Sequence, residues 1–284
     1  MEVQMSKSTA ESILDQVIAE HEASPVDMLG IGDAGGEYAY LKTLRDSYAR
    51  TVADVRRLHD QPRAGERILE LGSFLGPVCI TLKRLGYDVL AADIPEFHDS
   101  NSLRELYRRN GVPFDGVNLR HAQLPYGSES MDLVILCEVL EHLNFNPLPA
   151  LAEINRVLKT GGHLYIGMPN QASIVNRIKL LFGQSIHNPI QEFFAQLDRN
   201  SNMIVGLHWR EYTMTETSQL MDSMGFDVVR SEYYANSGAT KRISTWLIRK
   251  VLYLWPSFRP FLVVVGKKRP TAPSHDFHRV EANS

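Results

Sequence analysis

The sequence is poor in cysteine, in long apolar runs and in excess charge of either sign. Its two cysteines, Cys79 and Cys137, lie inside apolar runs, so we expect buried, reduced thiols and neither a disulfide framework nor a zinc cluster built from cysteines. The longest apolar stretch, Trp246 to Val265, is interrupted by charged residues and prolines, which argues against a transmembrane helix of about 20 uncharged residues. The 30 Lys and Arg against 33 Asp and Glu give a net charge of -3, so the whole chain has no general attraction for nucleic acid or an anionic membrane.

The chain is long enough to bury a full core, with 284 residues of which 44% are hydrophobic. Its first 20 residues are polar and lack the apolar segment of a secretory signal, so we expect no export and a cytoplasmic location. The segment 270–284 is polar and contains proline, and we expect it to be a disordered tail.

Short runs rich in Val, Ile and Leu alternate with segments of helical period from Arg67 to about Val265. This alternation is typical of βαβ units and predicts an α/β fold with a doubly wound, seven-stranded, mostly parallel sheet. Thr213 and Glu216 stand at capping-box spacing and predict a helix that stops at Gly225. The strands are expected at Arg67 to Leu71, Tyr87 to Ala92, Gly116 to His121, Met131 to Cys137, His163 to Met168, Phe226 to Tyr234 and Phe261 to Gly266.

Two parts depart from simple alternation. Residues 1–64 are expected to form an N-terminal helical cap or lid, and residues 170–210 an insert between the fifth and sixth strands. The domain that carries the sheet is expected over 65–269 and includes a basic amphipathic helix at 240–258. Doubly wound sheets bind ligands at the carboxyl ends of their strands, where both the cap and the insert could close over a site.

A glycine-bearing turn, Glu70 to Pro77, follows the first strand, and Asp93 ends the second. In a dinucleotide fold this turn would read G-x-G-x-x-G, so that the backbone can approach a pyrophosphate. Phe74 and Pro77 stand at the second and third glycine positions. Phe74 would obstruct that approach and Pro77 removes an amide at the helix start, which disfavours NAD.

A nucleoside without phosphates fits the turn better. Gly72 and Gly76 leave room for a sugar and a methionine tail, and Asp93 can accept hydrogen bonds from two ribose hydroxyls. S-adenosylmethionine is such a ligand.

At this turn the chain resembles the class I, seven-stranded Rossmann-like methyltransferases, whose first motif is an acid, any residue and then Gly-x-Gly-x-Gly. It matches at Glu70, Gly72 and Gly76 and departs at Phe74. Further similarity to the small-molecule, type 11-like branch extends the resemblance over about two thirds of the chain, through Leu124 to Tyr126, Met131 to Leu143 and Leu158 to Leu164.

The resemblance implies S-adenosylmethionine as the cofactor and a methyltransferase activity. Relatives have an acid facing the adenine amino group just before the Leu-Pro pair, whereas this chain has Gln123, which can still bond an adenine edge. The cofactor contacts implied are Glu70, Gly72, Ser73, Phe74, Gly76, Asp93, Ile94, Gln123, Leu124, Cys137 and Glu138.

Methyl transfer to a hydroxyl requires a general base, and His142 and His208 are the candidates. Glu138 and Glu141 flank the same site and are interpreted as structural or cofactor-orienting carboxylates. Some RNA methyltransferases place a nucleophilic cysteine after a proline, but Leu136 precedes Cys137, so this cysteine is interpreted as a small buried hydrophobe. No metal site is predicted.

The acceptor is not identified by the sequence. The segment after the fourth strand does not resemble the Asn/Asp-Pro-Pro-Tyr motif of DNA amino-methyltransferases, which disfavours nucleic-acid bases. The leading hypothesis is O-methylation of a small-molecule, glycan or lipid-linked acceptor. The alternatives are a methyltransferase acting on RNA or protein, and a catalytically silent binding module.

The segment Lys241 to Arg269 contains eight Lys and Arg and no acid. It is interpreted either as a helix at the sheet edge or as an amphipathic helix that contacts a membrane, at its inner face, or a lipid-linked acceptor. In the first interpretation the side chains packed inward are Trp246, Leu247, Val251, Leu254 and Trp255.

Overall fold

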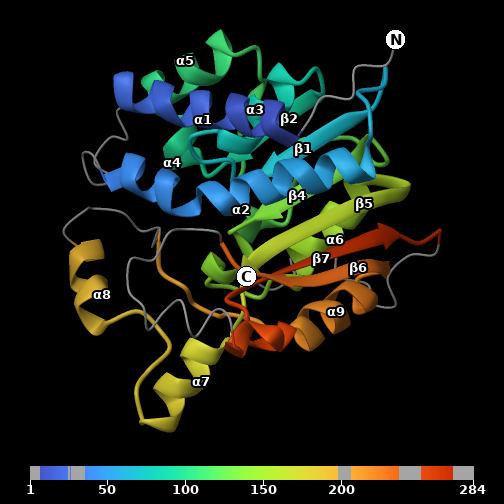
Figure 1. The fold of residues 1–284 in the computed structure, drawn as a ribbon. Coiled ribbons are helices and arrows are strands. Elements are labelled where there is room, and N and C mark those ends of the chain that lie inside the picture. The colour runs from blue at the N-terminus through green and yellow to red at the C-terminus, as the bar shows by residue number, and fades with distance from the viewer. Residues whose placement is uncertain (1–6, 25, 27–35, 198–205, 237–250, 271–284) are drawn as a thin grey trace.

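A computed structural model describes residues 7–24, 26, 36–197, 206–236 and 251–270 of the chain (Figure 1). Its centre is a seven-stranded sheet in the order β3-β2-β1-β4-β5-β7-β6. The first five strands in this order pair in parallel, whereas β7 is antiparallel to both β5 and β6. The predicted fold class is confirmed. The strands are β1 Arg67–Leu71, β2 Asp88–Asp93, β3 Phe114–Gly116, β4 Met131–Cys137, β5 Leu158–Pro169, β6 Phe226–Tyr234 and β7 Phe261–Lys268.

Helices cover both faces of the sheet (Figure 1). On one face α1, α2, α3 and α5 share a hydrophobic cluster with the sheet, and on the other face α6 and α9 do so. The helices are α1 Lys7–Ala23, α2 Gly36–Leu58, α3 Pro77–Arg84, α4 Pro95–His98, α5 Asn101–Arg109, α6 Leu148–Val157, α7 Ile174–Leu181, α8 Ile190–Leu197 and α9 Met214–Ser223, with short 3-10 turns η1 Leu119–His121, η2 Leu140–His142, η3 Leu252–Leu254 and η4 Pro256–Phe258.

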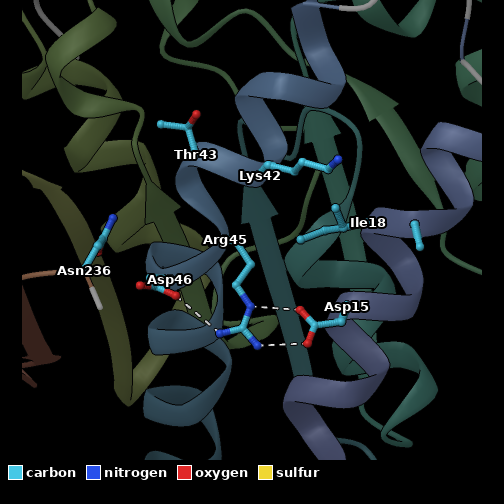
Figure 2. A pocket seen from close by; sticks show the side chains of 8 residues that line it. Asp15, Ile18, Lys42, Thr43, Arg45, Asp46 and Asn236 are labelled. Carbon is cyan, nitrogen blue, oxygen red and sulfur yellow. Dashed lines mark hydrogen bonds and ion pairs between the residues drawn. The ribbon is translucent and has the colours of Figure 1, made fainter. Parts of the chain in front are cut away.

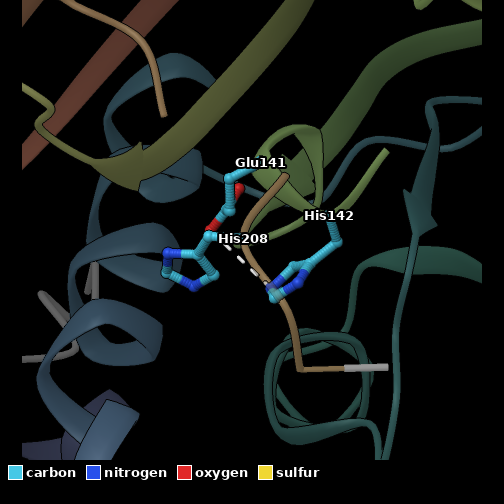
Figure 3. A group of neighbouring side chains, drawn as sticks. All are labelled: Glu141, His142 and His208. Atoms are coloured by element: carbon cyan, nitrogen blue, oxygen red, sulfur yellow. Dashed lines mark ion pairs between the residues drawn. The ribbon is translucent and has the colours of Figure 1, made fainter. Parts of the chain in front are cut away.

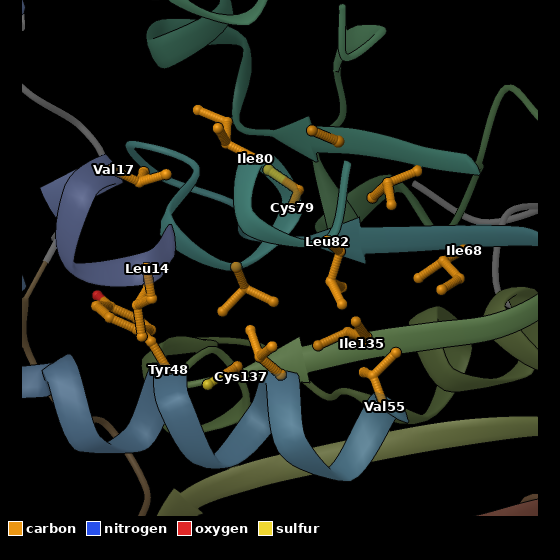
Figure 4. Packing of buried hydrophobic residues seen from close by; sticks show 14 of the residues in the cluster. Leu14, Val17, Tyr48, Val55, Ile68, Cys79, Ile80, Leu82, Ile135 and Cys137 are labelled. Carbon is orange, nitrogen blue, oxygen red and sulfur yellow. The ribbon is translucent and has the colours of Figure 1, made fainter. Parts of the chain in front are cut away.

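Side-chain alternation along the strands divides the core into these two clusters. In β4, Leu133 and Ile135 join the cluster with α1, α2 and α3, whereas Val134 and Leu136 join the cluster with α6 and α9. Successive residues of a strand point to opposite faces, so a strand buried on both sides reads as a continuous apolar run. Figure 4 shows the first cluster, where α2 lies along the sheet.

The N-terminal helices belong to this sandwich. Val52 and Val55 of α2 are 2% and 0% exposed, and Thr51 donates a hydrogen bond to the Sγ of Cys137 at 3.2 Å. Both Cys79 and Cys137 are buried free thiols, as expected. The helices α1 and α2 therefore form a layer over the sheet, and the opening of this region as a lid stays a prediction.

A buried ion-pair network ties α2 to the edge strand β6. Asp54 is 0% exposed and lies 2.7 Å from the Nε of Arg50 and 2.8 Å from the Nη1 of Arg230. Glu232 pairs with both of these arginines. Because a buried carboxylate must be neutralised, this network determines where α2 lies against β6.

The third strand differs from the prediction, which set it at Gly116 to His121. The strand is Phe114–Gly116, paired with Ala91 to Asp93, and the chain then enters η1. The side chain of Asn118 accepts a hydrogen bond from the backbone of Arg120. Such local bonds offer the backbone an alternative to a strand ladder, which is why the apolar pattern misplaced the strand.

Most of the basic helix predicted at 240–258 lies outside the described residues, and in its described part only Val251 is α-helical. Residues 252–258 form η3 and η4, and Val251, Leu254 and Trp255 are 49%, 73% and 58% exposed, so these three side chains do not pack inward. Trp246 and Leu247 lie outside the described residues, as does the predicted tail beyond Pro270. The capping box of α9 is confirmed at Thr213 and Glu216.

Candidate functional site

The carboxyl ends of β1, β2 and β4 meet at one edge of the sheet, because these neighbouring strands are parallel. The turn after β1 is fastened to β2, since the N–H groups of Gly72 and Ser73 donate to the carbonyl of Ala92 at 2.8 and 3.2 Å. It is also in contact with the segment after β4. A Cβ at Gly72 would lie 2.4 Å from the Cγ2 of Val139. The predicted cofactor turn and the predicted catalytic segment are therefore adjacent.

The turn has left-handed backbone at Gly72, Phe74 and Gly76, with φ of 72°, 48° and 73°. A non-glycine residue in this region costs roughly 1–2 kcal/mol. Phe74 is held there by its N–H, which donates to Asp93 at 2.6 Å, and by its carbonyl, which accepts from the hydroxyl of Tyr107 at 2.8 Å. Phe74 thus takes a conformation that favours glycine.

An aromatic cluster surrounds the ring of Phe74. The ring lies 5.6 Å from that of Phe97 and 5.8 Å, edge to face, from that of Tyr40 in α2. Partial burial, followed by the nearby carboxylates of Glu138 and Glu141, raises the pKa of Tyr40 above its usual value. Tyr40 therefore lies between the turn after β1 and the segment after β4, and no signal in the sequence had indicated it.

Asp93 ends β2 and is 8% exposed. Its Oδ2 accepts from Phe74 and its Oδ1 from the N–H of Ile94 at 2.7 Å. Burial raises the pKa of Asp93 to about 6, against the opposing effect of these two hydrogen bonds. Each carboxylate oxygen retains a lone pair, so this group can still receive the two hydroxyls of a ribose.

Glu70 is buried and accepts a hydrogen bond from the protein backbone. It is 3% exposed, and its Oε2 accepts the N–H of Cys79 in the first turn of α3 at 2.9 Å. Burial raises the pKa of Glu70 to about 8. In this structure Glu70 fixes the start of α3, and its direct contact with a cofactor stays a prediction.

The other predicted contacts lie in varied environments. Ser73 is buried, and its Oγ lies within hydrogen-bond distance of the hydroxyl of Tyr107, at 2.8 Å. Leu124 is buried with its N–H bonded to Glu153, whereas Gln123 is exposed. Burial raises the pKa of Cys137 well above its usual value, so this thiol stays protonated and is not a nucleophile.

Glu138, directly after β4, has left-handed backbone with φ 55°. Its N–H donates to the carbonyl of Gly167 at 2.8 Å. Its Oε1 is buried without a hydrogen-bond partner among the described residues. Burial raises the pKa of Glu138 to about 8, against the opposing effect of its side-chain hydrogen bonds with Glu141 and Ser47.

The two predicted histidines come together beside Glu141 (Figure 3). The rings of His142 and His208 are 4.9 Å apart and nearly perpendicular. Burial, followed by the charge of His208, lowers the pKa of His142 to about 4. Burial lowers the pKa of His208, but its hydrogen bond with Glu211, 3.0 Å away, and the charges of Glu141 and Glu211 produce a net rise.

A separate surface pocket of about 380 Å³ lies between α1 and α2 (Figure 2). Its charged side chains pair with each other. Arg45 bonds both oxygens of Asp15, at 2.8 and 3.0 Å, and also contacts Asp46. We interpret this pocket as a junction between two helices rather than a ligand site.

S-adenosylmethionine fits the residues at the sheet edge on three observations. Asp93 presents a carboxylate with lone pairs for ribose hydroxyls. The turn at Gly72 has no room for a side chain. A buried carboxylate oxygen of Glu138 beside this turn is unsatisfied among the described residues, and it suits the cationic methionine end of the cofactor.

The strand order, the antiparallel β7, the glycine turn after β1 and the acid that ends β2 are those of the class I, Rossmann-like methyltransferase fold, whose cofactor is S-adenosylmethionine. Residues 69–166 match the family model described as a methyltransferase domain. The predicted resemblance, fold class and cofactor are thereby confirmed.

Two curated relatives match part of the chain. A demethylmenaquinone methyltransferase of Clavibacter sepedonicus is 36% identical over 108 residues, which are 37% of this chain and 42% of that protein. A ubiquinone biosynthesis O-methyltransferase of Ruegeria sp. is 32% identical over 103 residues, 36% of this chain and 41% of that protein. The chain therefore spans less than half the length of these two relatives.

Solved structures of low identity share the fold. A 1,6-didemethyltoxoflavin-N1-methyltransferase of Burkholderia thailandensis has a TM-score of 0.53 at 16% identity, covering 95% of this chain and 93% of that chain. A SAM-dependent methyltransferase of Thermotoga maritima has a TM-score of 0.51 at 19% identity, covering 92% and 100%. These likenesses establish the architecture and leave the acceptor open.

Proposed function

We propose that the protein transfers the methyl group of S-adenosylmethionine to a hydroxyl oxygen of a small-molecule or lipid-linked acceptor. The observation that carries this proposal is the closeness of two histidines. His142 lies in the segment that follows β4, and the ring of His208 is 4.9 Å from its ring. A hydroxyl acceptor must lose its proton as its oxygen bonds to the methyl carbon, so it needs a nearby base. A neutral amine can attack with its lone pair before it loses a proton, so it depends less on a base. Two imidazoles at the acceptor side therefore favour oxygen.

When bound, S-adenosylmethionine supplies an electrophilic methyl group, which the acceptor oxygen takes while the carbon–sulfur bond breaks. Asp93 would hold the ribose, and the backbone of the turn from Gly72 to Gly76 would line the cofactor site. Tyr40 of α2 limits access of water from the side of the aromatic cluster. Alignment and exclusion of water account for much of the rate of such displacements.

The names of the two curated relatives, which concern quinone pathways, support an acceptor with a hydroxylated ring. Exposed apolar side chains near the insert support delivery of such an acceptor from a lipid surface. These side chains, which we call the apolar ridge, have exposed fractions between 58% and 81%. They are Leu180, Leu181, Phe182, Leu254 and Trp255.

The apolar ridge has one part at the end of α7 and one part at η3, and a contact joins α7 to η4, which follows η3. Arg177 of α7 lies over the ring of Phe258 in η4 at 5.1 Å. Residues 171–191 and 251–270 contain no Asp or Glu, so these two segments themselves add no negative charge that an anionic lipid surface would repel. Apolar side chains flanked by cations are typical of interfacial contacts.

The membrane contact predicted through Lys241 to Arg269 cannot be assigned to most of the described basic residues of this segment. Arg259, Lys268 and Arg269 are bonded within the protein, to Tyr233, Leu158 and Asp222 among others, and residues 241–250 lie outside the described ranges. Across the ranges that the structure covers, helices long and apolar enough to cross a membrane are absent. The proposal is therefore a peripheral contact made by the apolar ridge.

Cofactor binding is the first test. We expect calorimetry to show binding of S-adenosylmethionine and S-adenosylhomocysteine by the intact chain, and a loss of about a hundredfold in Asp93→Ala, because two hydrogen bonds to a charged group are removed. The matched control is Asp88→Ala, an exposed acid at the opposite end of β2, which should bind normally. Failure of the folded, intact chain to bind either compound would leave only the silent binding module.

The acceptor atom is tested separately. The chain is supplied with cofactor and a panel of phenols, catechols and quinols in detergent, and products are identified by mass spectrometry and NMR. A methyl ether supports the proposal. A product methylated only at nitrogen or carbon would contradict it while leaving the methyltransferase assignment intact.

A further inference from the structure

Glu141, His142 and His208 bring together one carboxylate and two imidazoles (Figure 3). One donor atom from each of the three side chains lies within 4.8 Å of the other two. Glu141 and His142 belong to η2 after β4, and His208 belongs to the segment in which the chain returns from the insert. We propose that these three side chains bind a divalent transition-metal ion.

The hydrogen bonds of the two imidazoles prepare them as ligands. The Nδ1 of His142 lies 2.9 Å from the carbonyl oxygen of Leu207. A carbonyl only accepts, so this nitrogen carries the proton and Nε2 presents its lone pair. The Nδ1 of His208 lies 3.0 Å from the carboxylate of Glu211, which fixes the same tautomer.

This arrangement is the one found around bound metals. Histidine ligands in proteins generally donate their other N–H to a backbone carbonyl or a carboxylate, which orients the ring and strengthens the ligand. Here His142 has the carbonyl and His208 has the carboxylate. Both outer partners are therefore already in place.

Glu141 supplies the second, independent observation. Its side chain is 0% exposed, neither carboxylate oxygen has a close hydrogen-bond partner among the described residues, and one of the side chains that it interacts with is another acid, Glu138. Its Oε1 lies 3.9 Å from the Nε2 of His142. A buried carboxylate in this state is costly, and a cation between it and the imidazoles would satisfy it.

The two segments that carry the ligands are fastened together by the backbone. The N–H groups of Trp209 and Arg210 donate to the carbonyl of Glu141 at 2.8 and 3.3 Å. Ligand bonds to zinc measure about 2.0–2.2 Å, so side-chain movements of roughly an ångström complete the site. Because the main chain is already held, only side-chain rotation is needed.

The donor set indicates the metal. Two imidazole nitrogens and one carboxylate oxygen suit Zn²⁺, Fe²⁺, Co²⁺ or Mn²⁺, and a three-residue set leaves coordination positions open for another ligand. Within the proposed function, and resting on it, the open position receives the acceptor hydroxyl and lowers its pKa. His142 and His208 would then favour a hydroxyl acceptor as ligands of the ion that lowers the hydroxyl pKa, in place of accepting its proton themselves, and that proton would leave to solvent.

Metal binding is measured on the full chain without cofactor or acceptor, so its result is independent of the proposed function. The chain is treated with a chelator, dialysed and titrated with Zn²⁺ by calorimetry and with Co²⁺ by visible absorption. We expect one ion per chain at micromolar affinity or tighter, with cobalt bands typical of nitrogen and oxygen ligands.

Variants test the assignment. His208→Ala and Glu141→Gln should each weaken Zn²⁺ binding at least about tenfold, and Glu211→Gln about ten- to a hundredfold through the outer partner alone. The control His121→Ala removes an exposed histidine and should bind normally. Binding of S-adenosylhomocysteine reports that each variant is folded. Absence of stoichiometric binding by the intact chain, or equal weakening in His121→Ala, would overturn the site.

Discussion

Phe74 illustrates how a single residue is held against its own backbone preference. Its φ of 48° favours glycine, yet its ring occupies the space between Tyr40 and Phe97. The backbone cost and the packing gain therefore act in opposite directions at one position. Two substitutions separate them, because alanine keeps the cost and loses the ring, whereas glycine loses both.

We expect Phe74→Ala to be less stable than Phe74→Gly by about 1 kcal/mol. The measurement is urea unfolding of both variants beside the unchanged chain. The usual order, in which alanine is the more stable of the two, would show that the left-handed backbone at this position is not retained.

A second residue-scale expectation concerns pH. Burial raises the pKa of Asp93 from its ordinary value of 3.8 to about 6, so the folded chain binds more protons than the unfolded chain between these values. Stability without cofactor should therefore fall as pH rises from about 4 to 6, by up to about 3 kcal/mol. Burial also raises the pKa of Glu70 and of Glu138 to about 8, so unfolding curves of Asp93→Asn across this range should keep the slope that these groups contribute and lose only the share of Asp93. An unchanged slope in the variant would contradict the assignment.

At the scale of elements, α2 depends on its ion pairs with β6. Asp54→Ala leaves Arg50 and Arg230, 23% and 18% exposed, without their buried partner, and we expect a loss of about 3–4 kcal/mol in unfolding free energy. Asp15→Ala breaks a pair whose carboxylate is 54% exposed and should cost at most about 1 kcal/mol. Similar losses in both variants would show that Asp54 does not anchor α2.

The elements also show how far the sequence determines the fold. Strands β1, β4 and β6 have the predicted bounds, because each is an apolar or alternating run bounded by turn residues. The third strand was misplaced, because the local bond of Asn118 competes with strand pairing. Apolar periodicity reports burial reliably, but it does not report which side-chain bond ends an element.

At the scale of the whole molecule, the sequence predicted the turn that follows β1 but not the side chains that pack around it. Gly72, Asp93 and Glu138 follow strands whose neighbours can be deduced from the fold. The approach of Tyr40 from α2 and of His208 to His142 depends on how distant segments pack. No local pattern encodes such contacts, which is why Tyr40 and the ligand role of Glu141 were missed.

Lipid contact is a property of the whole surface. We expect the chain to co-sediment with vesicles containing anionic lipid and less with zwitterionic vesicles, because the region of the apolar ridge lacks acids. Replacing Leu181 and Phe182 with serine should weaken binding about tenfold or more. The control is Val229→Ser, an equally apolar side chain on β6 that is 51% exposed. Equal binding by all three proteins would contradict the proposal.

The insert leaves and rejoins the domain at adjacent points. Asn170 and Tyr212 form a bridge, and the N–H of Gln171 donates to the carbonyl of Tyr212 at 3.1 Å. The side chain of Asn170 also bonds the carbonyls of Ser257 and Arg259, so the junction is closed whatever lies between. Since the cost of closing a loop rises slowly with its length, the segment between Asn170 and Tyr212 can vary in length without opening the end of β5.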